Sequence, residues 1–166
     1  MTMKRFRTMA AAVAIAAFAA LPGLAQPIAL PPPYGAPITL EIAKKAMAAA
    51  EAEAARNNWP VVIVILDSGG NMVMLHRIED AQLASIQIAE GKARTALILK
   101  RPSKAFEEAI AAGGGGLRLT TLAGVTAVEG GHPIVVGGKI VGAIGVSGVL
   151  SAQDSQVARA GLDALK

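Results

Sequence analysis

Hydrophobic and polar residues follow two different periods along this chain, and the first half holds the clearest examples. Between residues 40 and 57, apolar residues recur at the three- and four-residue spacing of a helix with one buried face, and Thr39 precedes them as a helix cap. Residues 61–66 are all apolar and mostly β-branched, which predicts a central strand buried on both faces. Turn residues at 67–70 then lead into residues 71–77, the predicted second strand of a hairpin.

The second half predicts two more helices, a long loop, a second hairpin and a final helix. Glu79 and Asp80 place negative charge before a helix over residues 81–99, and Ser103 caps a shorter helix that ends at the glycines of 113–116. Residues 117–131 lack a period, which is typical of a binding loop. Residues 134–136 and 139–146 predict the second hairpin, and residues 151–165 predict the last helix. The order α-ββ-αα-loop-ββ-α indicates an α+β fold, an antiparallel sheet with its helices packed on one side.

The first 25 residues have the pattern of a signal peptide that is removed during export. Three basic residues among the first seven are followed by 13 apolar residues, 9–21. That run is shorter than the roughly 20 apolar residues of a membrane-spanning helix, so we expect no stable membrane insertion after cleavage. Small residues at Gly23 and Ala25 predict cleavage before Gln26, and therefore a periplasmic or secreted protein. The mature chain then has a proline-rich arm, residues 26–37, and one domain, residues 38–166.

Charge and cysteine content exclude several classes of function. The net charge is +4, but three of the 16 basic residues lie in the leader, and the mature chain keeps a net charge of +1. That balance offers no concentrated basic face for nucleic acid. The chain has no cysteine, which excludes disulfides, thiolate metal sites and cysteine nucleophiles. Its glycine-rich stretches match neither the dinucleotide fingerprint nor the phosphate loop, so we expect no bound nucleotide.

The two histidines are the candidate metal ligands. Met72, Met74 and His76 share one face of a predicted strand, a combination that suits copper, although core methionines explain the same pattern more simply. His132 lies between a Gly-Gly pair and a proline, at the end of the long loop and the mouth of a strand. Binding residues are often placed at such positions, and an imidazole there could ligate haem iron; a surface histidine without a ligand is the alternative.

Five blocks of sequence occur in the order and spacing of a known family. The blocks are Val-Ile-Leu-Asp-Ser-Gly-Gly at 64–70 with Arg77, Ala-Glu-Gly-Lys-Ala-Arg-Thr-Ala at 89–96, Gly-Gly-His-Pro-Ile at 130–134, Gly-Lys-Ile-Val-Gly-Ala-Ile-Gly-Val-Ser-Gly at 138–148, and Gln-Asp at 153–154 with Ala-Gly at 160–161. From about Ile38 onward the chain resembles the GlcG and HbpS-like family of haem-binding, haem-degrading proteins. That family is related to the C-terminal domain of PduO-type adenosyltransferases.

The resemblance implies a profilin-like fold with an antiparallel sheet of about five strands, and assembly into symmetric homo-oligomers, often octamers. It also implies a small-molecule ligand, with haem as the expected cofactor. On this basis we hypothesise that His132 is the axial ligand of the haem iron and that Arg77 or Lys92 pairs with the propionates.

Family membership does not decide between binding and catalysis. We expect an exported haem-binding protein that acts in scavenging, sensing or degradation, with at most a weak haem-degrading activity. Two other functions remain open at this point. The protein could be an enzyme or accessory protein of organic-acid metabolism of the glycolate type, or a structural oligomer without a ligand.

Overall fold

The computed structural model describes residues 30–166, so the predicted signal peptide and the first residues of the proline-rich arm lie outside the described residues. The described part contains helices and strands in the order α1 (Leu40–Asn57), β1 (Val62–Asp67), β2 (Met72–Arg77), α2 (Ser85–Ile98), α3 (Lys104–Ala111), the 3-10 helix η1 (Gly114–Thr121), β3 (Gly131–Val136), β4 (Lys139–Ser147) and α4 (Ser151–Asp163). Among residues 30–166, no helix combines the length and the apolar character needed to cross a membrane.

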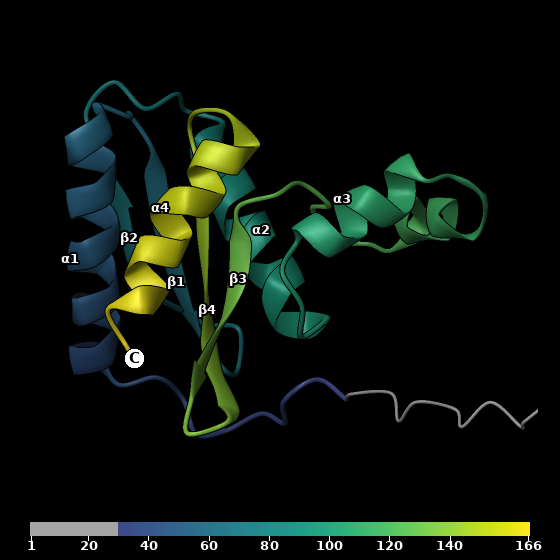
Figure 1. The fold of residues 1–166 in the computed structure, drawn as a ribbon, viewed down its shortest axis with the longest axis horizontal. Helices are drawn as coiled ribbons and strands as arrows, with labels where there is room; N and C mark the ends of the chain where they lie inside the picture. The colour runs from purple at the N-terminus through teal and green to yellow at the C-terminus, as the bar shows by residue number, and fades with distance from the viewer. Residues whose placement is uncertain (1–29) are drawn as a thin grey trace, which may run out of the picture.

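Four antiparallel strands form one sheet in the order β2-β1-β4-β3, so the two hairpins meet along β1 and β4. Helices α1 and α4 cover one face of the sheet and α2 covers the other (Figure 1). The α+β class and the antiparallel sheet are confirmed, but the prediction that all helices pack on one side is wrong. The physical reason is β1, whose residues from Val62 to Leu66 are completely buried and need a cover on both faces.

The predicted count of about five strands is one too many for the sheet, and a short strap partly fills the fifth position. Strand β4 extends beyond the end of β1, and the segment around Tyr34 pairs with this overhang. Gly35 N–H donates to the Ile140 carbonyl at 2.8 Å, and Ile140 N–H donates to the Pro33 carbonyl at 2.9 Å. The Tyr34 hydroxyl also donates to the carbonyl of Leu97 at the end of α2. The end of the proline-rich arm is thus attached to the fold.

Helix α3 and η1 form an arm that leaves the body beside β3 (Figure 1). They pack against each other, and neither has an extensive interface with the sheet or the other helices. The first part of the region predicted as an unstructured loop, residues 117–121, is therefore helical. The predicted end of the preceding helix at the glycines of 113–116 agrees with α3, and η1 begins within these glycines at Gly114. Ser103 stands at the start of α3 as predicted, but its hydroxyl makes no cap and instead bonds to Val128 and Gly131.

Two element starts differ from the predicted positions. Helix α2 begins at Ser85 rather than at residue 81, because Asp80 has a positive φ and the Arg77 guanidinium bonds to the Ala81 carbonyl. Strand β3 begins at Gly131 rather than at residue 134. As a result His132 lies within an edge strand and not in a loop. Pro133 is tolerated there because an edge strand does not need every N–H group for pairing.

Candidate functional site

His132 lies on β3 with its side chain under α4. Its imidazole is buried, with only 6% of the residue exposed, and Nε2 is 2.8 Å from the Ser155 hydroxyl. Nδ1 has no hydrogen-bond partner within residues 30–166. Every fully buried side-chain nitrogen or oxygen in that part of the chain has a partner, so Nδ1 is not fully buried. Nδ1 therefore keeps contact with solvent at the margin of the site.

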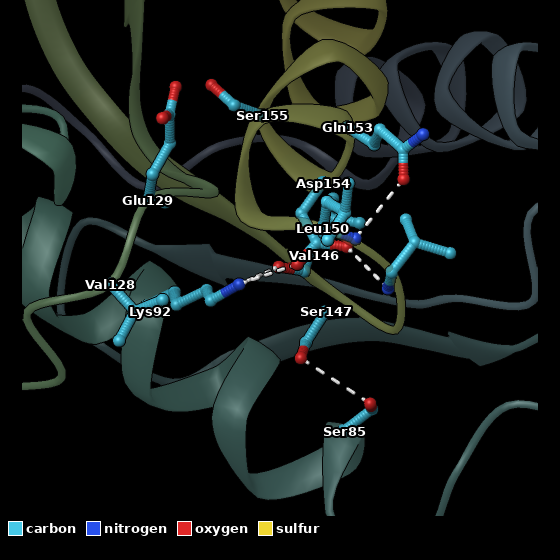
Figure 2. A network of polar contacts seen from close by, with 12 residues as sticks. Ser85, Lys92, Val128, Glu129, Val146, Ser147, Leu150, Gln153, Asp154 and Ser155 are labelled. Carbon is cyan, nitrogen blue, oxygen red and sulfur yellow. Dashed lines mark hydrogen bonds and ion pairs between the residues drawn. The ribbon is translucent and has the colours of Figure 1, made fainter.

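Glu129 fixes the direction of the bonds around this histidine. Its carboxylate lies beside the Ser155 hydroxyl (Figure 2), which donates a hydrogen bond to it. The Ser155 oxygen must then accept from the ring, so neutral His132 carries its proton on Nε2. The lone pair is left on Nδ1, the nitrogen that reaches solvent. The chain from Glu129 through Ser155 thus orients His132 as a carboxylate orients a metal-bound histidine.

Three charged groups surround the histidine. Lys104 Nζ lies 2.7 Å from a Glu129 oxygen, and Arg159 Nη2 lies 3.9 Å from the other. Burial favours a higher pKa for Glu129, but the hydrogen bonds from Lys104 and Ser155 and the charge of Arg159 hold that pKa below its usual value. Glu129 therefore stays ionised and keeps accepting the Ser155 proton.

The same surroundings keep the His132 ring neutral. Burial and, to a smaller extent, the charge of the nearby Arg159 lower its pKa to about 4, while Glu129 opposes the shift. A neutral imidazole is the form that binds a metal ion. At neutral pH His132 is thus in its ligating form without competition from protons.

Lys92 occupies a separate, internal position. Its ammonium group is buried, donates to Asp154 Oδ2 at 2.7 Å and to the Val146 carbonyl at 3.0 Å, and ties α2 to α4 (Figure 2). Asp154 Oδ1 also accepts the Val149 N–H just before α4. Burial raises the pKa of Asp154, against the opposing effect of the Lys92 charge. The positive charge of Lys92 is therefore paired with Asp154 inside the fold.

The Gly130-Gly131 pair makes room for this lysine. A Cβ on Gly131 would overlap the Lys92 carbonyl, and a Cβ on Gly130 would lie 3.0 Å from Lys92 Nζ. Gly145, the register partner of Gly131, likewise meets the backbone of α2 at Ala89. The glycines of the sequence blocks thus let α2 lie directly on the sheet.

Arg77 and His76 lie on the opposite edge of the sheet from His132. Strand β2, which carries both, is separated from β3 by β1 and β4. The Arg77 guanidinium bonds to the Ala81 carbonyl, and His76 Nδ1 is 2.5 Å from a Glu51 oxygen. The structure therefore does not bring His132, Arg77 and Lys92 together, and the propionate roles of Arg77 and Lys92 stay predictions.

Comparison with known proteins identifies the fold. A sequence profile described as "Haem degrading protein HbpS-like" matches residues 38–163. The chain belongs to the HbpS-like family. Protein GlcG of Escherichia coli K12 is 40% identical over 110 residues, 66% of this chain and 81% of GlcG.

Two solved structures have the same fold as this chain. A double mutant of Streptomyces reticuli HbpS is 31% identical with a TM-score of 0.73, covering 92% of this chain and 99% of that one. The crystal structure of a PduOC–haem complex is 26% identical with a TM-score of 0.72, covering 78% of this chain and 96% of that one.

Sequence reasoning predicted His132 as a site residue but did not predict the groups that orient it. Ser155, Glu129 and Arg159 stand 23, 3 and 27 positions away from it, and no spacing in the sequence links them. The sequence did contain one indication that Lys92 is buried: it lies on the same helix face as the apolar residues Ala89 and Ala96. A lysine on the buried face of a helix requires an internal partner.

Proposed function

We propose that this protein binds haem or a related tetrapyrrole, with His132 Nδ1 as the ligand of the iron. The description of its family as haem-degrading and the haem held by the related PduOC support this proposal. The observation that carries it is the state of His132: the ring is neutral, Nε2 is held by Ser155 and Nδ1 keeps its lone pair toward solvent. A neutral imidazole nitrogen with a lone pair can serve as an axial ligand of haem iron.

Arg159 is the group that we assign to a propionate. Its side chain is 59% exposed, and its only ion pair within residues 30–166 is the long contact to Glu129. A guanidinium can form two parallel hydrogen bonds to a carboxylate. Lys104 is less suitable because Glu129 and Glu108 already hold its ammonium group.

Apolar surface next to Arg159 fits the flat body of a tetrapyrrole. Arg159 lines a groove of about 740 Å³ between α1 and α4, within the usual size range of small-molecule sites. Much of the groove is lined by alanines, at Ala49, Ala52, Ala152 and Ala160. The groove is also lined by Glu53, Arg56, Gln156 and Asp163 and not by His132, so the ligand nitrogen and the groove lie at different parts of α4's surroundings. The residues that support the proposal are therefore one nitrogen ligand, His132, and one exposed cation, Arg159.

The predicted leader places this function outside the cytoplasm, so the proposal is an exported protein that scavenges, senses or degrades haem. A bound haem would supply redox chemistry at its iron. This chain would contribute the ligand, its orientation and the charge that holds a propionate.

A haemin titration tests the proposal. The purified protein is titrated with haemin, with and without peroxide or reductant, and compared with His132→Ala and with His76→Ala as the matched control. We expect a stoichiometric shift of the Soret band that His132→Ala abolishes and His76→Ala retains. An unchanged Soret band and affinity in His132→Ala would remove this histidine from the site.

A further inference from the structure

Glu79 and Asp80 place two negative charges next to each other in the connection between β2 and α2. Both residues are exposed, and neither side chain takes part in an ion pair or hydrogen bond within residues 30–166. The sequence predicts that they stabilise the start of a helix, but α2 begins at Ser85 and has no acidic residue in its first turn. The effect of a helix dipole falls off within the first turn, so it does not account for these two charges.

The hairpin of β1 and β2 brings this acidic pair beside Trp59. Ile78 N–H donates to the Val61 carbonyl at 3.0 Å, just beyond the last register pair of the two strands. Trp59 and Pro60, which precede β1, therefore lie next to the residues that follow β2. Together with the C-terminal turn of α1 they form a hollow of about 350 Å³, at the lower end of the size range of small-molecule sites.

The chemistry of this hollow favours a cation. Glu79 and Asp80 are its only charged lining residues, and within the described part of the chain no lysine or arginine lines it. The last turn of α1 also ends there, and a helix C-terminus carries a partial negative charge. Trp59 adds an indole, the side chain whose face attracts cations most strongly.

We propose that the hollow binds a small organic cation, an ammonium group that carries apolar substituents. Glu79 and Asp80 pair with its charge, while the indole of Trp59 contacts its substituents beside Pro60 and Ile78. A metal ion fits less well. Hard cations such as Ca²⁺ take about six to eight oxygen ligands, and residues 30–166 contain no group of three histidine or carboxylate side chains that could hold a metal.

This site is separate from the one at His132. The hollow lies at the end of β2, and His132 lies on β3, which is the opposite edge of the sheet. Binding of an organic cation therefore does not depend on the proposed haem ligand, and each can be measured without the other.

Tryptophan fluorescence reports on the hollow directly, since Trp59 is the only tryptophan of the chain. The protein, without added haemin, is titrated with choline and with neohexyl alcohol, the uncharged carbon analogue of choline. Sodium chloride at equal concentration is the control for ionic strength. We expect a saturable change with choline at an affinity about tenfold or more above that of the alcohol. Equal affinities for choline and the alcohol, or the same response to choline and sodium chloride, overturn the proposal.

A double variant tests the two carboxylates. Glu79→Gln with Asp80→Asn removes both charges, and asparagine tolerates the positive φ of 64° at position 80. We expect the affinity for choline to fall about tenfold. Glu41→Gln, which removes an exposed charge at the opposite end of α1, should leave it unchanged. A double variant that binds choline as tightly as the native protein overturns the proposal; if it does not fold, the comparison of choline with the alcohol decides.

Discussion

Lys92 and Asp154 form a buried ion pair of 2.7 Å that connects helices on opposite faces of the sheet. The pair passes the end of the sheet beside Gly130, the position where only a glycine leaves enough room. Both side chains are 2% exposed. Burying two charges has a large desolvation cost, so their mutual contact is what makes the burial tolerable.

Removing one partner of this pair should destabilise the fold strongly. Lys92→Met leaves the Asp154 carboxylate buried without its cation, and we expect the free energy of unfolding to fall by about 3–5 kcal/mol. Urea unfolding measures it. Arg94→Met, which removes an exposed pair with Glu90 on the same helix, should cost less than about 1 kcal/mol. If Lys92→Met with Asp154→Asn, which removes the charge and keeps the oxygen that accepts the Val149 N–H, is as unstable as Lys92→Met alone, the unpaired charge is not the cause.

Gly131→Ala should also destabilise the protein, through sterics. The new methyl group would overlap the Lys92 carbonyl, so α2 must move away from the sheet. We expect a loss of about 1–3 kcal/mol or more in the free energy of unfolding. Gly115→Ala is the control, because its methyl group would meet only the flexible end of Arg118. Equal melting temperatures for the two variants would contradict the close approach of α2.

Local patterns of the sequence were enough for the elements that carry one clear period. The predicted helix over residues 40–57 has the bounds of α1, and the Thr39 hydroxyl accepts the Ile42 N–H as a cap. The burial of β1 on both faces also follows from its unbroken apolar run. Here the local preference and the tertiary contacts agree, so the pattern predicts the structure.

Features that depend on distant contacts could not be predicted. The start of α2 is set by a bond from Arg77, and the strand position of His132 depends on pairing with β4. The orientation of the His132 ring depends on Ser155, which is 23 residues away. Single-sequence periodicity carries no information on such pairs, and this is why the site was predicted at His132 without its supporting groups.

The buried His132 should make stability depend on pH. Its pKa is 6.5 in the unfolded chain and about 4 in the fold, so the unfolded state binds the proton first as pH falls. The contribution of neutral His132 to the free energy of unfolding is complete above pH 6.5. This contribution, about 3 kcal/mol, is lost as the pH falls toward 4. The measurement is the difference in unfolding free energy between the native protein and His132→Asn across that range. A difference that stays constant from pH 7 to pH 4 would exclude this assignment.

Haem affinity should follow the same titration. Because Nδ1 ligates only when the ring is neutral, we expect the affinity to stay level from pH 7 to about 5 and to fall as pH approaches 4. Absorption titration at each pH measures it, with folding verified by circular dichroism. An affinity that falls with a midpoint near 6.5 instead would mean that an exposed histidine is the ligand.

Ser103 should control the arm formed by α3 and η1. Ser103→Ala removes the acceptor of Gly131 N–H and the donor to the Val128 carbonyl, both at the arm's base. Leaving such groups unpaired costs about 1–3 kcal/mol, and the ends of the arm lose their connection. We expect faster amide hydrogen exchange across residues 104–128 than across α1. Thr121→Ala, whose exposed hydroxyl bonds only to the nearby Arg118 carbonyl, should leave exchange unchanged. Uniform acceleration over the whole chain would show that Ser103 supports the entire fold and not the arm.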